Sequence, residues 1–372
     1  TDAHFVHLPY MSCSAFAFSP LLISPDLLVK DGWIDSQALH TEQEFSPYTT
    51  HFESVVTFKD HLLKLVCANI EVKKSPSYKR FVKETSWLKD YALFRALKTV
   101  YHDRPWYDWP YKLASHEAEA LDVFQHEHTD LVETYCIEQF LFFQQWQKLR
   151  AYAESKNIGL FGDLPIYVSL DSADVWANPN LFRLDQKTGK PTHVSGVPPD
   201  YFSETGQRWG NPLYNWNSKN PKIDQALRDW WISRIAHQFT LVDKLRIDHF
   251  RGFESYWEIP ASEDTAVNGH WQKGPGADLF HQMEKALGTL DIIAEDLGII
   301  TEEVEQLRKA LGFPGMKVLQ FGFDGNPHNP HLPHNYNSPE YVVYTGTHDN
   351  ETSVGWYLNP QFNDHDRAEI KK

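Results

Sequence analysis

The chain of 372 residues contains few cysteines, and their positions exclude several kinds of protein. Cys13, Cys67 and Cys136 are odd in number and widely spaced, and they include no Cys-x-x-Cys pair. This pattern argues against a disulfide framework and against a zinc cluster, and it favours a reducing compartment. We therefore expect no metal and no other cofactor. The expected location is the cytoplasm or, for a photosynthetic eukaryote, the plastid stroma.

The sequence also lacks long apolar runs and an excess of positive charge. No stretch of about 18 apolar residues is present, so no membrane-spanning helix is expected. Lys and Arg number 35 against 50 Asp and Glu, which gives a formal net charge of −15 at pH 7. A chain this acidic is a poor candidate for binding nucleic acid or an anionic membrane surface, so we expect neither as a partner. No pattern indicates an oligomeric state.

Both ends lack the signals that usually frame a complete chain. Thr1 is followed by no basic-then-apolar signal segment. Residues 366–372 have the pattern of a helix without a cap or stop signal. We therefore expect the sequence to be part of a longer chain.

Aromatic and apolar residues are abundant. The chain is 41% hydrophobic and 23% charged, which is enough for a sizeable core and excludes global disorder. It contains 13 Trp, 17 Tyr and 23 Phe. Aromatic rings stack on sugars and bases, but they also fill cores, so this excess alone does not separate the two roles.

The pattern of apolar residues changes near residue 157. Before it, helical spacing dominates, most clearly at 60–70, 87–100 and 138–154. After it, short apolar runs alternate with helical stretches, which predicts an α/β fold with parallel strands and right-handed crossovers. The segment 171–220 shows little periodicity, which indicates a functional loop. We expect strands at 159–168, 245–250, 291–294, 317–323 and 341–344, and helices at 222–238, 277–287 and 301–311.

Acidic residues follow several of the expected strands. Asp248 ends one strand, Glu295 and Asp296 end the next, Asp349 follows a third, and Asp163 lies on an earlier one. In a parallel barrel the carboxyl ends of the strands converge on one mouth, where the chemistry takes place. A single acid after a strand is often only the cap of the following helix. Acids on three such strands, each beside Arg, His or Gly, favour a shared site.

Two or three carboxylates at one mouth suggest chemistry on a glycosidic bond. One ionised acid attacks the anomeric carbon, while a protonated acid with a raised pKa donates to the leaving oxygen. Arg246 lies two residues before Asp248, on the same face of the strand, and should keep it ionised. We therefore expect Asp248 as nucleophile and Glu295 as acid/base, about 5–5.5 Å apart as in retaining enzymes.

With these motifs in place, the chain resembles the 4-α-glucanotransferases (amylomaltases or disproportionating enzymes) of glycoside hydrolase family 77, in the α-amylase clan. The likeness covers nearly the whole chain. Besides the carboxylate motifs, the matching stretches are PY at 9–10, SAFA at 14–17, PLLI at 20–23, WLKDYALFRALK at 87–98, GDLPIYV at 162–168, DSADVW at 171–176, GVPPDYF at 196–202 and WGNPLYNW at 209–216.

The resemblance implies a role for each matching residue. Asp248 forms the covalent glucosyl intermediate, Glu295 protonates the leaving oxygen and then activates the incoming 4-hydroxyl, and Asp349 stabilises the distorted ring. The implied substrates are maltooligosaccharides and starch- or glycogen-type α-1,4-glucans. The loop at 198–202 resembles the family's lid. The remaining expected substrate-binding residues are Arg246, His249, His348, Tyr10, Asp163, Asp200, Tyr201, Phe202 and Trp209.

The implied fold is a (β/α)8 barrel that is incomplete in this chain, with inserted helical subdomains. We expect a loop-rich barrel segment at 1–49, a helical insertion at 50–137, and the barrel core at 138–372 with a lid or loop insertion at 171–220. We expect about three of the eight strands of such a barrel to be absent from this sequence. The chain also has Phe18 and Ser19 where the family usually has Gly and Asn, so the local turn should differ if the glycine had a positive φ.

Two other functions remain open at this point. A hydrolase uses the same carboxylates and the same intermediate, with water as the acceptor. A truncated chain that binds glucans without turnover is the other alternative.

Overall fold

The computed structural model describes residues 10–200, 203–216, 218–360, 367 and 370. The described residues fall into two compact units. Unit 1 takes its residues from Thr1–Leu160, Tyr167–Val242 and Trp257–Trp271. Unit 2 takes its residues from Phe161–Ile166, Asp243–Tyr256 and Gln272–Lys372. Together they form a mixed α/β fold, which confirms the predicted class.

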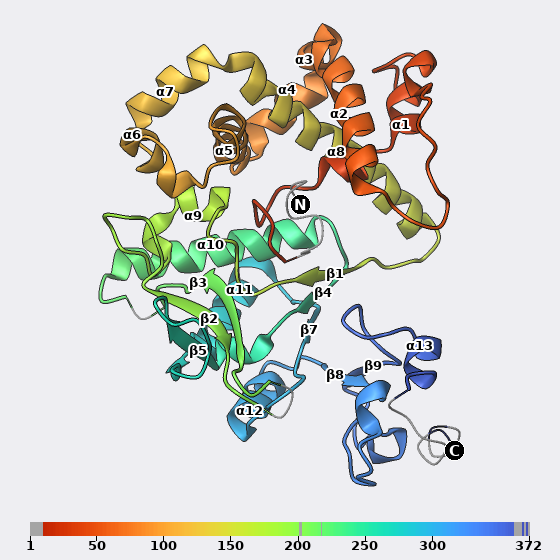
Figure 1. Cartoon of the computed structure of the whole chain (residues 1–372), viewed down its shortest axis with the longest axis vertical. Coiled ribbons are helices and arrows are strands. Elements are labelled where there is room, and N and C mark those ends of the chain that lie inside the picture. Colours follow the sequence, from red (N-terminus) through yellow and green to blue (C-terminus); the bar gives the residue numbers. More distant parts are fainter. Residues whose placement is uncertain (1–9, 201–202, 217, 361–366, 368–369, 371–372) are drawn as a thin grey trace. The chain divides into compact units, whose positions relative to one another are not determined.

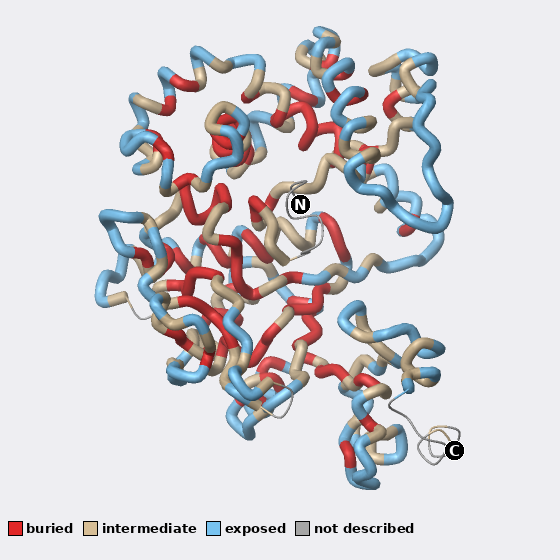
Figure 2. The backbone as a smooth tube through the Cα atoms, viewed as in Figure 1, coloured by how far each residue is buried: buried red, intermediate tan, exposed pale blue. Residues whose placement is uncertain are grey.

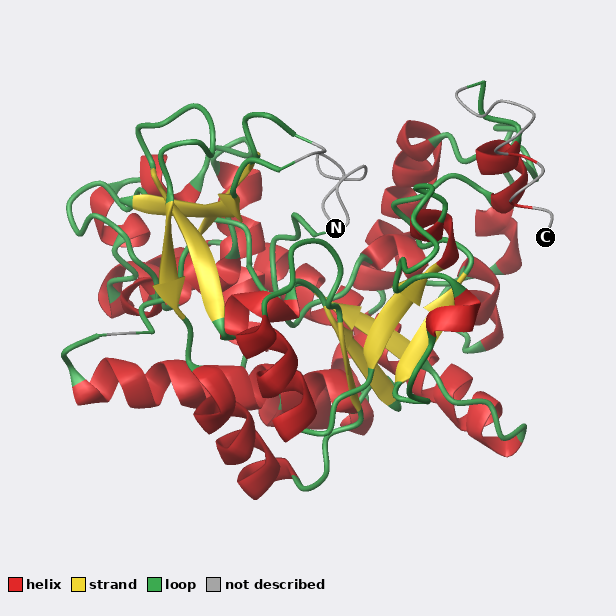
Figure 3. Cartoon of the chain, turned by 90° about the horizontal axis from the view of Figure 1, so that it is seen from below, coloured by secondary structure: helices red, strands yellow, loops and turns green. Residues whose placement is uncertain are grey.

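Unit 1 is mostly helical (Figures 1 and 3). None of the helices in the described ranges has both the length and the apolar character needed to cross a bilayer. Short 3₁₀ turns lie at Pro20–Leu22, Ser36–Leu39, Trp106–Asp108 and Pro179–Leu181. The helices are α1 Pro25–Lys30, α2 Phe52–Ala68, α3 Ile70–Lys74, α4 Pro76–Glu84, α5 Leu88–Val100, α6 Tyr111–Ala114, α7 Ala118–Glu127, α8 Thr129–Ser155, α9 Ala173–Ala177 and α10 Pro221–Phe239.

The predicted helices of this unit are present, with different ends. The helix predicted at 60–70 begins earlier, at Phe52, and ends at Ala68 because the side chain of Asn69 accepts the Glu71 N–H and caps α3. The helix predicted at 138–154 begins already at Thr129. It therefore runs through residues 137 and 138, where the sequence suggested a domain boundary. The division into 1–49, 50–137 and 138–372 stays a prediction.

The segment 171–220 is more regular than its composition suggests. Besides α9 it contains two antiparallel strands, β2 His193–Val197 and β3 Gln207–Pro212. They belong to a sheet with the order β3-β2-β5-β6, in which β5 is Ser255–Pro260 and β6 is His270–Lys273. Gly196 allows β2 and β3 to pair closely, since a Cβ there would run into the Gln207 carbonyl.

Unit 2 contains the parallel strands. β1 Phe161–Leu164, β4 Lys244–Ile247 and β7 Ile292–Ala294 form one parallel sheet in that order, and β8 Gly315–Val318 pairs in parallel with β9 Tyr341–Tyr344 (Figure 1). The helices are α11 Gly276–Leu287, α12 Glu302–Ala310 and α13 Ser353–Tyr357, with 3₁₀ turns at Phe250–Phe253, Leu319–Gly322 and Pro333–Asn335.

The strands predicted from the sequence in this unit lie where expected, but some are shorter. The strand at 341–344 has the predicted bounds. The strand predicted at 317–323 is wrong beyond residue 318. Val318 pairs with Tyr344, where β9 ends, so the following residues have no partner strand and form a 3₁₀ turn.

The core of unit 2 fixes the chain directly after β4. Phe250 and Phe253 are fully buried and pack against Phe280 with ring centroids 5.7 and 5.0 Å apart, and Phe280 packs against Phe313 at 5.4 Å. Burying each ring contributes about 1.5–3 kcal/mol. This cluster and the buried strands β4 and β7 (red in Figure 2) anchor the loop that follows β4.

Candidate active site

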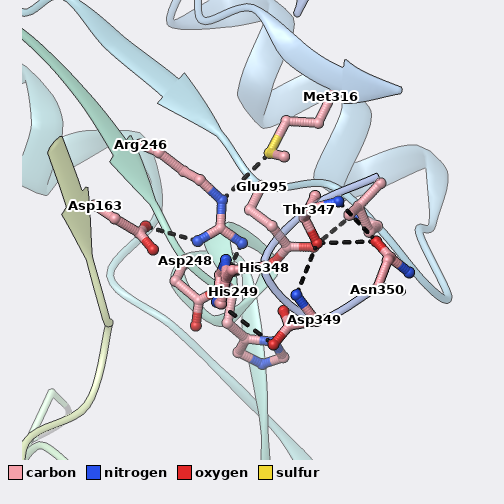
Figure 4. A network of polar contacts seen from close by, with 11 residues as sticks. Asp163, Arg246, Asp248, His249, Glu295, Met316, Thr347, His348, Asp349 and Asn350 are labelled. Carbon is pink, nitrogen blue, oxygen red and sulfur yellow. Dashed lines mark hydrogen bonds and ion pairs between the residues drawn. The ribbon is translucent and has the colours of Figure 1, made fainter. Parts of the chain in front are cut away.

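Two carboxylates follow neighbouring parallel strands of unit 2. Asp248 is the first residue beyond β4, and Glu295 is the first residue beyond β7. The backbone continues the strand pairing at these positions: the Asp248 N–H donates to Leu164 O at 2.9 Å, and the Glu295 N–H donates to Ile247 O at 3.0 Å. Both side chains therefore emerge at the same edge of the sheet, as Figure 4 shows.

Arg246 lies between two of the carboxylates (Figure 4). Asp163 on β1 is its register partner, and Arg246 Nη1 donates to Asp163 Oδ1 at 2.6 Å. Its Nη2 donates to Asp248 Oδ1 at 2.8 Å. Burial alone would lower the pKa of Arg246, but these two carboxylates raise it above its ordinary value. The guanidinium is thus a fixed positive charge beside Asp248.

The pKa of Asp248 results from opposing influences. Burial raises it above the ordinary value, and Arg246 counters this effect through the ion pair. The negative charges of Asp163 and Asp349 act in the same direction as burial. The expected effect of Arg246 is present, but burial, which the sequence pattern did not include, outweighs it.

Glu295 has the environment of a proton donor. Although part of the side chain stays open to solvent, burial raises its pKa to about 7, and the negative charge of Asp248 adds to this effect. Its Oε1 accepts the Leu297 N–H and its Oε2 accepts the His249 N–H, both at 2.8 Å. These hydrogen bonds and Arg246 lower the pKa, but they do not outweigh burial. They also fix the orientation of the carboxyl group.

His249 holds a left-handed backbone conformation, with φ 51° and ψ 47°. Such a conformation costs a non-glycine residue roughly 1–2 kcal/mol, and residues of this kind concentrate at functional sites. The buried phenyl rings of Phe250 and Phe253 lie immediately after it and hold the turn. Burial, assisted by the positive charge of Arg251, lowers the pKa of His249 to about 3, so the imidazole is neutral near pH 7.

The loop after β9 carries His348 and Asp349. Asn350 Oδ1 accepts both the N–H and the hydroxyl of Thr347, at 2.9 and 3.0 Å, and Thr347 Oγ1 accepts the Asp349 N–H at 3.3 Å. His348 Nε2 lies 3.4 Å from Asp349 Oδ1. The Asp349 side chain is 70% exposed, so it is open to a ligand.

Several residues support this site, and the sequence assigned none of them a role in it. Asp296 Oδ1 accepts the Met316 N–H at 2.7 Å, and its Oδ2 pairs with Arg308 Nε at 3.1 Å. A Cβ on Gly315 would run into the Asp296 carboxylate. Met316 in turn accepts a hydrogen bond from Arg246 Nε at its sulfur, at 3.4 Å. Asp296 was visible as an acid after a strand, whereas no sequence pattern indicates Met316.

The other predicted contacts belong to unit 1. Asp200 Oδ1 accepts the Ser203 N–H at 2.8 Å, Trp209 Nε1 donates to Gln207 Oε1 at 3.1 Å, and Tyr10 is half-buried. Their roles at the carboxylates of unit 2 stay predictions. Tyr201 and Phe202 lie outside the described residues.

Comparison with known proteins identifies the family of the chain. The sequence model of glycoside hydrolase family 77, described as 4-alpha-glucanotransferase, matches residues 2–372. The chain belongs to the 4-α-glucanotransferase family. Its members are enzymes named for glucan transfer, and the predicted family is confirmed.

The chain spans about 70% of the length of two curated relatives that it matches. The 4-alpha-glucanotransferase of Synechocystis sp. is 46% identical over 359 residues, which are 95% of this chain and 70% of that protein. That of Thermus thermophilus is 46% identical over 355 residues, covering 94% and 69%. Among solved structures, amylomaltase from Streptococcus agalactiae in complex with acarbose matches with a TM-score of 0.90 and 37% identity, covering 98% of this chain and 73% of that one.

The turn at Phe18 and Ser19, which was expected to differ from that of the 4-α-glucanotransferase family, has no left-handed residue at either position. Phe18 is not among the described residues with a positive φ. Its ring stacks on Phe142 with centroids 4.2 Å apart, and its N–H donates to Gln139 Oε1 at 2.8 Å. Ser19 accepts the Leu21 N–H with its side chain and so caps the 3₁₀ turn that follows. The ring of Phe18 thus packs beside this turn, and the side chain of Ser19 caps it.

Proposed function

We propose that the chain moves α-1,4-glucan segments from donor to acceptor maltooligosaccharides by a retaining double displacement. The observation that supports this most strongly is the contrast between two neighbouring carboxylates. Burial raises the pKa of both, but the Arg246 guanidinium is paired with Asp248 and counters the rise there, whereas the pKa of Glu295 reaches about 7. An ionised nucleophile beside a protonated acid is the arrangement that retaining glycosidic chemistry requires.

In the first step, an oxygen of Asp248 attacks the anomeric carbon of the donor. The bond between that carbon and the glycosidic oxygen breaks, and Glu295 gives its proton to this oxygen as the shortened glucan leaves. The sugar is then bound to Asp248 as a glycosyl ester with inverted configuration, and Glu295 is ionised.

In the second step, the 4-hydroxyl of an acceptor glucan attacks the same carbon. Glu295 takes the hydroxyl proton, the bond to Asp248 breaks, and the second inversion restores the α configuration. Hydrolysis is the same step with water in place of the acceptor. Transfer therefore requires that acceptor binding excludes water from the intermediate.

The remaining residues bind and orient the sugar in this proposal. Asp349, exposed beside His348, accepts hydrogen bonds from hydroxyls of the sugar ring next to the scissile bond. Its negative charge stabilises the positive charge of that ring in the transition state. The neutral imidazole of His249 exchanges hydrogen bonds with the same ring, and Arg246 keeps Asp248 oriented. Further contacts are assigned to His348, Tyr10, Asp163, Asp200, Tyr201, Phe202 and Trp209.

We further propose that β1, β4, β7, β8 and β9 are strands of a (β/α)8 barrel, with residues 50–137 as a helical insertion and 171–220 as the lid region. The parallel pairing within β1-β4-β7 and β8-β9 supports this arrangement. The proposed substrates are maltooligosaccharides and starch- or glycogen-type glucans. The few, widely spaced cysteines favour the cytoplasm or a plastid stroma.

Incubation with maltotriose tests the reaction. Transfer releases glucose and longer oligomers while the number of reducing ends stays constant, whereas a rising number identifies a hydrolase. Asp248→Asn should abolish turnover and retain glucan binding. Asp291→Asn is the matched control, because Asp291 is exposed and precedes β7 at the opposite end of the same strand. Glucan binding without turnover in the unaltered chain would contradict the proposal and favour an inert binding protein.

A further inference from the structure

Two neighbouring cavities of unit 1 share one wall. Their volumes are about 180 Å³ and about 550 Å³. Both are lined by Phe16, Ser86, Trp87 and Ser233, so these four residues form the shared wall. We name the two cavities together the Trp87 groove. Its walls come from α4, α5, α8, α9 and α10, which Figure 1 labels, and from the segments beside them. The proposed catalytic carboxylates belong to unit 2 and do not line it.

Aromatic rings form much of the groove. Phe81, Phe140 and Phe143 line the larger cavity, and Tyr91 and Trp230 line the smaller one. Phe81, Phe143 and Trp87 are half-buried and remain partly open, whereas the other three rings are buried. Aromatic faces that remain partly open in a concave site are favourable surfaces for the C–H faces of pyranose rings, which are the apolar sides of a sugar.

The charged side chains of the groove already have partners. Arg80 and Lys148 each lie against a carboxylate, so a phosphate would have to compete with that carboxylate, whereas a neutral polyol leaves both ion pairs intact. Burial also lowers the pKa of His237, which lines the larger cavity. The contacts are Arg80 with Glu84 at 4.0 Å, Lys148 with Asp31 at 2.7 Å, Asp90 with His116 at 3.2 Å, and Asp174 with the Ala15 N–H at 2.7 Å.

Uncharged hydrogen-bonding groups complete the lining. The hydroxyls of Ser86, Ser233 and Thr240 belong to exposed residues at the rim. Gln144 Oε1 is buried and has no hydrogen-bond partner among the described residues. A buried acceptor of this kind is stabilised when a donor reaches it, and a sugar hydroxyl supplies that donor.

We propose that the Trp87 groove is a second carbohydrate site that holds a segment of an α-1,4-glucan chain. The ligand class rests on the proposed function, because the glucan is the substrate of the same chain. At roughly 30 Å³ per water, the smaller cavity has room for about six waters, the scale of one hexose ring. The larger cavity extends the path beyond Trp87. The groove thus tethers a long glucan while leaving short substrates unaffected.

Filling the groove tests this proposal. Ser233 is an exposed residue of α10 that lines both cavities, so Ser233→Arg adds a long side chain to the groove. Ala226→Arg is the control, because Ala226 is an exposed residue of the same helix and lines neither cavity. Each change is made in the Asp248→Asn background, and maltoheptaose binding is measured by titration calorimetry. Ser233→Arg should remove one binding event or weaken it by roughly tenfold or more. Ala226→Arg should bind like its parent.

A second variant keeps the test decisive. Ser86→Arg enters the groove from the segment before α5, and melting curves identify any variant that fails to fold. Loss of maltoheptaose binding in either folded groove variant supports the site. Equal stoichiometry and affinity in all variants overturns it. The titration needs no turnover, so its result is independent of the maltotriose assay. That assay tests the proposed function in chains that keep Asp248. Groove variants made in such chains should retain full transfer activity on maltotriose.

Discussion

Replacing Glu295 by Gln gives the sharpest physical test of the site, because its pKa makes folding stability depend on pH. The difference between the ordinary value of 4.5 and about 7 corresponds to about 3 kcal/mol, since one pKa unit is worth about 1.4 kcal/mol. The folded chain binds this proton more tightly than the unfolded chain. The stabilisation is therefore complete below about pH 4.5 and is lost as the pH rises to about 7.

Glu295→Gln removes this pH dependence. The amide keeps the shape of the side chain but offers only one acceptor to the N–H groups of His249 and Leu297. Losing that hydrogen bond costs about 1–3 kcal/mol at every pH, so it does not affect the slope. Relative to the unaltered chain, the variant should gain up to about 3 kcal/mol of stability between pH 5 and pH 8.

Urea unfolding at both pH values measures this difference, because other titrating groups are common to the two proteins and largely cancel. Glu340→Gln is the control, since Glu340 is an exposed carboxylate of the same unit. Its stability should follow that of the unaltered chain. If the stabilities of Glu295→Gln and the unaltered chain change in parallel from pH 5 to pH 8, burial does not raise the pKa of Glu295.

The remaining predictions concern the reaction and the supporting contacts. The kcat/KM of transfer should decline above about pH 7 as Glu295 loses its proton, and a flat profile from pH 6 to 8.5 contradicts its role as acid. Arg246→Met should lower the free energy of unfolding by up to about 3 kcal/mol. This is the low end of the cost of breaking a buried ion pair, because the Asp163 side chain is 35% exposed. An unchanged urea midpoint would contradict this expectation. Gly315→Ala should destabilise by about 1–3 kcal/mol by displacing the Asp296 carboxylate, and an unchanged melting temperature refutes the close contact.

The sequence predicted the strands of unit 2 where local pattern and partner agree. The run at 341–344 is apolar and is bounded on both sides by polar residues, and β9 has the predicted bounds. The run at 317–323 is also rich in apolar residues, but its partner strand ends at Tyr344, and this limit depends on pairing between distant segments. In the same way, α8 begins at Thr129, before the expected domain boundary at residues 137 and 138. Its buried residues lie on both sides of that boundary, and composition alone does not show this.

For the candidate site, the sequence predicted which residues to consider but not how they are held. Asp248 and Glu295 follow strands, and the parallel register brings them to one edge, as predicted. The two N–H groups on Glu295 and the left-handed backbone of His249 depend on the turn after β4 and have no sequence signature. Burial, which outweighs Arg246 in the pKa of Asp248, likewise appears only once the chain is folded.

The most direct test of the central proposal is to trap the glycosyl ester. The Glu295→Gln variant is incubated with an α-maltosyl fluoride, whose fluoride leaves without a proton from the missing acid, while the second step is slowed because no base activates the acceptor. Proteolysis and mass spectrometry then locate the added sugar. We expect one maltosyl group on Asp248. A label on Asp349 or another residue, or turnover of the fluoride with no labelled protein in a rapid quench, would contradict the assignment of Asp248 as the nucleophile.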